Sequence, residues 1–227
     1  MLGAFWVGRL DRGLLGRVTA DHVHAVAHAR RVDVGGEDDG DAHRGQLAVA
    51  VAIGQAGGVS VPFPEPTEPA ASRAEVFLRY LEFFRDRLVS KLEGLPPGEL
   101  RARRLPSGWA PIELIKHLRY VELRWLEWSF EGRDLPDPSA DVKDGRWYVG
   151  ASETLDGLVA ALDAQAARTR QIVAAHDLAD TGRPGERWDG TDPATLERVL
   201  FHLVQEYARH VGQLDIVAEL AGGPVGE

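Results

Sequence analysis

One stretch near the end of the chain combines the spacing of a buried helix face with two ionisable side chains. Its apolar positions recur at intervals of three and four residues, so they lie on one side of a helix. These positions are Leu196, Val199, Leu203, Leu214 and Val217. Glu206 and His210 share that side. Burying such groups is costly unless something pairs with them, so the sequence predicts a helix that packs against others and brings both side chains to a partner.

A divalent metal ion is one such partner. Residues four apart on a helix have Cβ atoms roughly 5–6 Å apart, so Glu206 and His210 can bind one ion together. His117, alone in another apolar helix, is the candidate third ligand, and the set is then of the His₂Glu type found in catalytic zinc sites. His202 is a candidate extra ligand or a partner of Glu206.

Other interpretations of the same residues stay open from spacing alone. A single histidine in an apolar helix, such as His117, is more often a core histidine with satisfied nitrogens. Glu206 could instead pair with Arg209 or Arg119, or lie at the edge of a bundle.

Four helical patterns follow the proline-rich stretch at residues 62–69. They cover residues 72–92, 111–130 and 152–176, and a fourth helix that is capped by Thr191-Asp192-Pro193 and ends at Gly222-Gly223. The first begins at a capping box formed by Ser72 and Glu75. The pattern predicts an all-α protein, an antiparallel four-helix bundle, whose two longer connections leave room for a loop over one end.

The region before the bundle has a different character. Residues 1–58 show poor periodicity and scattered glycine and acidic residues, and they predict a poorly ordered N-terminal extension. We interpret it as a candidate start-site artefact, with the native beginning near Val59 and the bundle domain at residues 59–227. Four histidines of this region are set aside as metal ligands: the first three are interpreted as exposed coil and the last as part of a chance motif. They are His22, His24, His28 and His43.

Composition excludes several partners and chemistries. The formal net charge of −9, without a basic stripe, argues against nucleic acid and anionic membranes. The chain has no cysteine, so any thiol chemistry needs a thiol carried in by a cofactor. No apolar run approaches the ~20 residues that span a bilayer, and the expected location is the cytoplasm. The wide apolar faces of the first and fourth helices favour a homodimer.

Two segments resemble the DinB-like superfamily of four-helix proteins. Ser107-Gly-Trp109, followed by residues 117–125, resembles the signature of the second helix in that superfamily. The run Glu206-Tyr-Ala-Arg-His210-Val-Gly212-Gln213 resembles the signature of the fourth helix. The resemblance implies that His117, Glu206 and His210 bind a divalent metal. Glutamate at position 206 is similar to the variant found in mycothiol-dependent maleylpyruvate isomerases, although isomerase activity itself is not expected, because those enzymes carry a further C-terminal domain.

The resemblance also implies a function. Such proteins use a metal to activate a low-molecular-weight thiol for S-transfer to an electrophilic substrate. Mycothiol is the expected thiol, because lysine is rare and arginine, alanine and glycine are abundant, a composition typical of GC-rich genomes. Zinc is the first choice of metal, with nickel, iron or manganese as alternatives. A metal-dependent hydrolase that activates water, and a non-catalytic stress-related binding protein, are the competing functions.

Several side chains are candidates for the pocket around the metal. The aromatic candidates are Trp109, Trp147, Tyr148 and Trp188, and packing in the core is the alternative role for each of them. Arg119 or Arg209 is expected to meet an anionic group of the substrate, with a plain solvent-exposed ion pair as the alternative.

Overall fold

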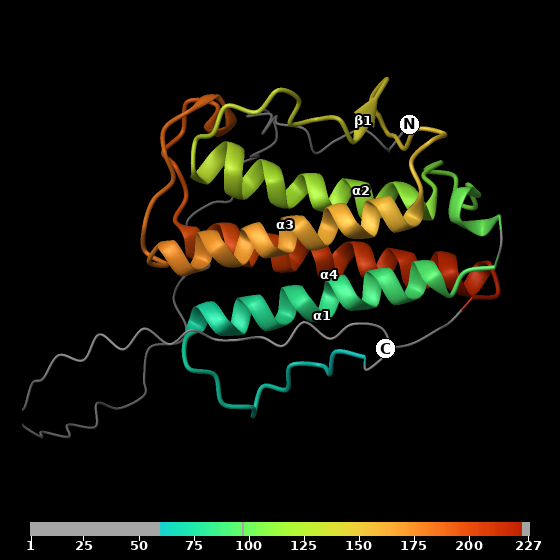
Figure 1. The fold of residues 1–227 in the computed structure, drawn as a ribbon, viewed down its shortest axis with the longest axis horizontal. Coiled ribbons are helices and arrows are strands. Elements are labelled where there is room, and N and C mark those ends of the chain that lie inside the picture. The colour runs from blue at the N-terminus through green and yellow to red at the C-terminus, as the bar shows by residue number, and fades with distance from the viewer. Residues whose placement is uncertain (1–59, 97, 224–227) are drawn as a thin grey trace, which may run out of the picture. The chain divides into compact units, whose positions relative to one another are not determined.

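The computed structural model of the protein describes residues 60–96 and 98–223. The elements follow in the order α1 (Arg73–Glu93), η1 (Glu99–Arg101), α2 (Pro111–Glu122), η2 (Leu123–Phe130), β1 (Val142–Lys143), β2 (Arg146–Trp147), α3 (Leu155–Ala175), η3 (Glu186–Trp188) and α4 (Leu196–Leu220). The four α-helices form a bundle (Figure 1), which confirms the four-helix prediction. The predictions for residues 1–58, including the four histidines of that region, lie outside the described residues.

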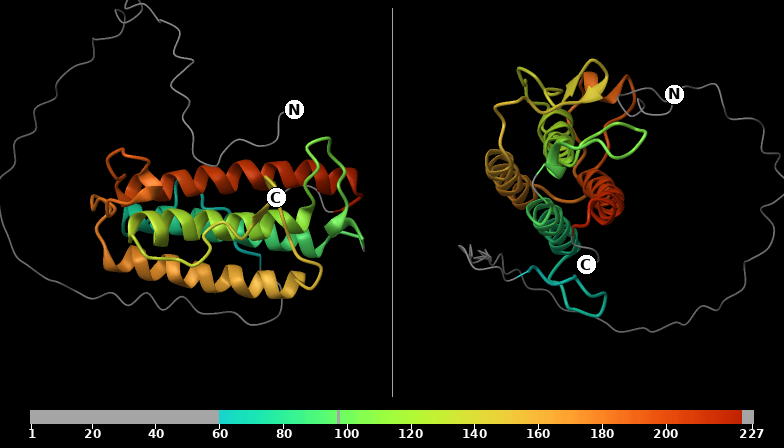
Figure 2. Two further views of the ribbon diagram at one scale, coloured as in Figure 1. Left: turned by 90° about the horizontal axis from the view of Figure 1, so that it is seen from above. Right: turned by 90° about the vertical axis from the view of Figure 1, so that its right-hand side faces the viewer.

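The bundle mixes parallel and antiparallel neighbours. Helices α1 and α4 run in one direction and α2 and α3 in the other (Figure 1). Seen end-on, α2 and α1 lie on opposite sides, each between α3 and α4 (Figure 2). The parallel pairing of α2 and α3 requires the connection at residues 131–154 to return along the bundle. This connection therefore passes over α2, where the histidine of that helix lies.

Side-chain caps set the beginnings of three helices. Ser72 accepts a hydrogen bond from the Glu75 N–H at 3.1 Å, as the capping box predicts. The predicted cap of the fourth helix is wrong by four residues, because the cap is Thr195, whose hydroxyl accepts from the Arg198 N–H. The chain stays extended up to Thr195 because this residue forms a β-bridge with Thr181.

The second predicted helix is not uniform. Its last eight residues, η2, are wound as a π-helix, and the N–H of Glu131 bonds to the carbonyl of Leu126 five residues earlier. The Ser129 hydroxyl donates to the Arg124 carbonyl at 2.7 Å. A π-helical turn changes the direction of the side chains that follow it, and such turns are frequent at functional sites.

A short hairpin lies within the long connection. Val142 pairs with Trp147 in antiparallel register. The turn residues Asp144 and Gly145 have φ values of 53° and 72°, the left-handed conformation that two-residue hairpin turns require. This hairpin was not predicted from the sequence. It fixes the places of Trp147 and of Asp141, which precedes the first strand.

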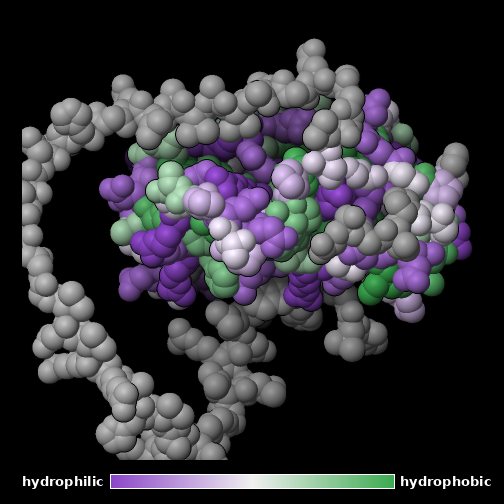
Figure 3. All heavy atoms as spheres, turned by 90° about the horizontal axis from the view of Figure 1, so that it is seen from below, coloured by the Kyte–Doolittle hydropathy of each residue, from purple (hydrophilic) through white to green (hydrophobic). Residues whose placement is uncertain are grey.

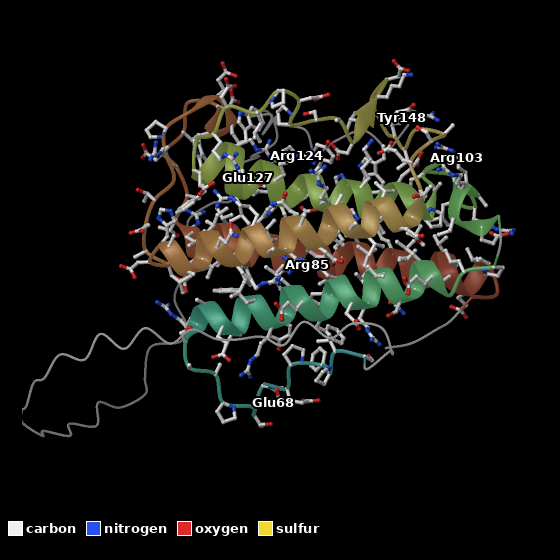
Figure 4. All side chains as sticks on the ribbon, in the orientation of Figure 1. Glu68, Arg85, Arg103, Arg124, Glu127 and Tyr148 are labelled. Atoms are coloured by element: carbon white, nitrogen blue, oxygen red, sulfur yellow. The ribbon has the colours of Figure 1, made fainter. Side chains whose placement is uncertain are left out.

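The centre of the bundle contains a buried ion pair that involves all four helices. Glu122 of α2 has no exposed surface and accepts two hydrogen bonds from the guanidinium of Arg85, at 2.8 and 2.7 Å. The hydroxyls of Thr169 and Tyr207 donate to the same carboxylate. Figure 4 shows Arg85 reaching from α1 into the space between the helices. Burial alone raises the pKa of Glu122, but the charge and hydrogen bonds of Arg85 outweigh it and hold that pKa below its ordinary value.

The surface is mostly mixed in polarity. Hydrophilic and hydrophobic residues are interspersed on the face drawn in Figure 3. On α4, Phe201, Ile216 and Leu220 are each more than half exposed, but the homodimer expected from the sequence stays a prediction. No helix in the described part of the chain is both long enough and apolar enough to cross a membrane.

The buried ion pair gives the first prediction. Glu122→Gln leaves the buried guanidinium of Arg85 without its counter-charge, and we expect the free energy of unfolding to fall by about 3–5 kcal/mol in urea titrations. Glu82→Gln is the matched control, because it removes a more exposed ion pair with Arg170 that also joins two helices. That change is expected to lower the free energy of unfolding by less than about 1 kcal/mol. Equal losses of unfolding free energy in the two variants would contradict the stabilising role of the buried ion pair.

The lowered pKa of Glu122 predicts a pH dependence. Because the folded-state pKa lies below the unfolded-state value, the stabilising contribution is complete above about pH 4.3 and is lost as the pH falls further. The difference in unfolding free energy between wild type and Glu122→Gln should therefore narrow below about pH 4. A difference that stays constant or widens between pH 7 and pH 3 would show that this carboxylate is not stabilised as described.

Candidate metal centre

The structure brings together the three residues that the sequence singled out. His117 of α2 lies opposite Glu206 and His210 of α4, and one ligand atom from each lies within 4.8 Å of the other two. The rings of the two histidines are 5.1 Å apart between centroids. Their side chains are 13% and 9% exposed, and that of Glu206 is 20% exposed. The group is therefore close enough for one ion, and each of its side chains keeps some contact with solvent.

Hydrogen bonds fix which nitrogen each histidine presents. The Nδ1 atom of His117 lies 3.0 Å from a carboxylate oxygen of Asp141. The Nδ1 atom of His210 lies 2.9 Å from the side-chain oxygen of Gln213. These oxygens act as acceptors, so each Nδ1 carries a proton, and Nε2 is the nitrogen left to hold a cation, either a second proton or a metal ion. Both rings therefore present Nε2 as a metal ligand, with the other nitrogen held as in known metal sites.

The spacing between Glu206 and His210 tests whether a cation fits. The Nε2 atom of His210 lies 3.2 Å from a carboxylate oxygen of Glu206. A lone pair and a carboxylate oxygen at this distance repel each other unless a cation, either a proton or a metal ion, neutralises the contact. Two imidazole nitrogens and one carboxylate oxygen suit zinc and other divalent first-row metals. The donor set therefore fits a divalent metal ion.

Asp141 is the buried anchor of His117. Its carboxylate also accepts hydrogen bonds from the guanidinium of Arg124, at 2.6 and 3.2 Å. Figure 4 shows Arg124 on the side of the second helix that faces the long connection. Burial raises the pKa of Asp141, but the hydrogen bonds from His117 and Arg124 outweigh this and lower it. The carboxylate is thus ionised and orients His117.

The charges of the ligands also suit metal binding. Burial lowers the pKa of His117, and the hydrogen bond to Asp141 compensates only in part. When a proton occupies Nε2 of His210, its hydrogen bond to the carboxylate lowers the pKa of Glu206, and a metal ion would take the place of that proton. Near neutral pH these shifts favour a neutral imidazole and an ionised carboxylate, the forms that bind metals.

An aromatic side chain from the hairpin covers the site. Trp147 stacks on His117 with ring centroids 4.2 Å apart and an interplanar angle of 24°. The same indole meets the ring of His210 edge-on at 5.3 Å, and Trp109 packs against it at 5.9 Å. The hairpin thereby restricts water and side-chain motion on this side of the three ligands.

His202 contacts the second oxygen of Glu206. Its Nε2 atom lies 3.5 Å from that oxygen, and its ring meets Trp125 edge-on at 4.7 Å. It does not belong to the close group of ligand atoms among the described residues. Of the two roles predicted for His202, the geometry favours a partner of Glu206.

The arginine and aromatic side chains that were candidates for the pocket do not all lie at the site. The contacts of Glu206 are with histidines, while Arg119 lies over the ring of Tyr120 at 4.7 Å. Of the aromatic candidates for the pocket, Trp147 and Trp109 lie at the site. The ring of Tyr148 lies instead beside two lysine ammonium groups. Trp188 is buried and donates from its indole N–H to the backbone at 2.8 Å.

The residues that hold the candidate ligands in place were not predicted from the sequence. Asp141 and Arg124 carry no periodic signal, because Asp141 lies in a connection and Arg124 lies within the π-helical segment η2. The dipeptide Asp144-Gly145 was the available clue, since Asp-Gly is a strong hairpin signal. It would have predicted a hairpin turn three residues after Asp141, but not the contact of Asp141 with His117.

With this geometry in view, comparison with known proteins identifies the family. The chain matches the mycothiol-S-transferase family over residues 76–223, well over half of its length. It belongs to this family. The matched region includes all three candidate ligands and Asp141. This membership confirms the DinB-like resemblance that the sequence motifs carry.

One solved structure is similar at a lower level. YfiT from Bacillus subtilis is 16% identical, with a TM-score of 0.49, and the match covers 71% of this chain and 95% of that one. That protein is described as a probable metal-dependent hydrolase with an unusual four-helix bundle topology. The curated proteins searched contain no match to the chain.

The anchor of His117 gives a prediction on metal affinity. Asp141→Asn removes the charged acceptor at Nδ1, and we expect the affinity for Zn²⁺ to fall about 10–100-fold in a chelator competition titration. Asp144→Asn is the matched control, because it changes the same residue type at the exposed hairpin turn. Its affinity should equal that of wild type. Unchanged affinity in Asp141→Asn would show that the carboxylate does not support a metal ligand.

Proposed function

We propose that this protein is a divalent-metal-dependent enzyme that activates a low-molecular-weight thiol of the mycothiol type for S-transfer to an electrophilic substrate. The observation that carries the proposal is the group formed by His117, Glu206 and His210, whose ligand atoms lie within 4.8 Å of one another. Three protein ligands leave a coordination position for a substrate, as in catalytic zinc sites. Zinc is the first choice of metal, and nickel, iron or manganese are the alternatives.

Two further facts support thiol chemistry. The family to which the chain belongs is described as mycothiol-S-transferase. The chain itself has no cysteine, so no thiol of its own competes for the metal or for the electrophile. A bound divalent metal lowers the pKa of a thiol and favours the nucleophilic thiolate.

The side chains around the centre have distinct roles in this proposal. Asp141 holds His117 in the tautomer that presents Nε2, and Gln213 does the same for His210. His202 orients the second oxygen of Glu206. Trp147 covers both histidine rings and limits access of water to the centre.

The metal content of variants tests the proposed ligands. His117→Ala, Glu206→Ala and His210→Ala should each lose most of the zinc that elemental analysis finds in the purified wild type. His176→Ala is the control, since this histidine pairs with Asp180 on the exposed surface, and its metal content should match wild type. Equal metal content in all five proteins would refute the site.

A turnover assay tests the reaction class. The metal-loaded protein should accelerate the loss of 1-chloro-2,4-dinitrobenzene only when mycothiol is added, and His210→Ala should abolish this acceleration. The thiolate sulfur bonds to the ring carbon, and chloride leaves with the electrons of the carbon–chlorine bond. Turnover that needs no thiol would favour the hydrolase, and metal binding without any turnover of electrophiles would favour the binding protein.

A further inference from the structure

An uncompensated arginine lies on the loop before the fourth helix. The guanidinium carbon of Arg187 is 4.5 Å from the ring centroid of Trp125 and 5.7 Å from that of Trp128. Within residues 60–96 and 98–223, Arg187 makes no hydrogen bond and no ion pair, and its Nε atom is buried without a partner. The side chain is half-buried, so solvent reaches only part of it.

The local charge makes this arrangement costly for the folded protein. Burial, with the charge of Arg124 as the second cause, lowers the pKa of Arg187 to about 10. The charge of Arg124 is balanced by Asp141, whereas that of Arg187 has no such balance among the described residues. A contact with an aromatic face stabilises a cation by only about 0.5–2 kcal/mol. The guanidinium is therefore held, protonated at neutral pH, in a place where an anion would improve its energy.

This arginine is connected to the candidate metal centre by two side-chain contacts. The ring of Trp125, on which Arg187 stacks, meets the ring of His202 at 4.7 Å. His202 in turn lies 3.5 Å from Glu206. The indole of Trp125 and the imidazole of His202 thus separate the guanidinium from Glu206 of the candidate centre.

We propose that Arg187 binds a carboxylate of the electrophilic substrate and that Trp125 holds the guanidinium in place for this contact. The proposal rests on the proposed function for the identity of the substrate, but the binding of an anion can be tested without it. A guanidinium matches a carboxylate with two parallel hydrogen bonds. The aromatic face of Trp125 restrains the plane of the guanidinium, which lowers the entropy lost on binding.

The charges favour a carboxylate over a phosphate. The neighbouring Arg124 donates both of its terminal nitrogens to Asp141, so a single guanidinium remains for the ligand. One guanidinium balances the single charge of a carboxylate but only part of the charge of a phosphate dianion. With the metal bound, its two positive charges are reduced by Glu206 alone among the three ligands, so the whole region attracts anions.

The test compares two unreactive probes of the same shape, benzoate and benzamide. Binding to the zinc-loaded and to the metal-free wild type is measured by calorimetry and by tryptophan fluorescence. We expect benzoate to bind at least tenfold more tightly than benzamide in both forms. Arg187→Gln should weaken benzoate binding about tenfold or more, as expected for a hydrogen bond to a charged group, and leave benzamide binding unchanged. Arg187→Lys should restore only part of the loss, because it keeps the charge but not the planar fork.

The control variant is Arg183→Gln, which removes an exposed arginine from the same loop and should change neither affinity. Equal binding of the two probes to wild type, or an unchanged preference in Arg187→Gln, would overturn the proposal and leave Arg187 as a packing residue. Because no thiol is present, these outcomes are independent of the turnover assay. Benzoate binding that depends on zinc but not on Arg187 would place the anion at the metal. This result would also overturn the proposal.

Discussion

The carboxylate of Glu122 receives hydrogen bonds from the three other helices of the bundle, and the rest of the structure is arranged around this acceptor. The donors are Arg85 of α1, Thr169 of α3 and Tyr207 of α4. Apolar side chains alone tolerate sliding of one helix along another, whereas a buried carboxylate with fixed donors favours one register. Because Glu122 follows His117 by five residues and its donor on α4 directly follows Glu206, the same register brings the candidate ligands of the two helices together. We infer that the buried ion pair sets the geometry of the candidate metal centre.

The candidate ligands could be predicted from the sequence, but the residues that hold them in place could not, for a physical reason. A helix fixes the direction of each side chain. The periodicity around His117 and Glu206 therefore predicted that both residues lie on the buried faces of their helices. Asp141 and Trp147 lie in a connection, where no repeat constrains direction, and their positions depend on a hairpin and on tertiary contacts. The same limit explains the fourth helix, whose cap at Thr195 depends on a bridge to a residue fourteen positions earlier. The parallel direction of α2 and α3 could not be predicted from periodicity either, because it depends on the path of the long connection.

The charges around the centre form two groups with different functions. Asp141 and Arg124 balance each other and hold His117, so this pair is structural. Among the described residues, Glu206 has only histidines as partners, and Arg187 has no carboxylate partner. Such uncompensated charges in partly buried positions are typical of binding sites. A divalent metal and an anionic substrate would satisfy both, which ties the proposed function and the proposed carboxylate site to one electrostatic argument.

The most direct test of the metal centre is the anomalous diffraction of zinc in crystals of the protein. We expect a zinc ion about 2.0–2.1 Å from the Nε2 atoms of His117 and His210 and about 2.0–2.2 Å from a carboxylate oxygen of Glu206. The Nδ1 atoms of the two histidines should keep their hydrogen bonds to Asp141 and Gln213. A zinc ion bound through Nδ1 of either ring, or anomalous signal only at residues outside this group, would contradict the account.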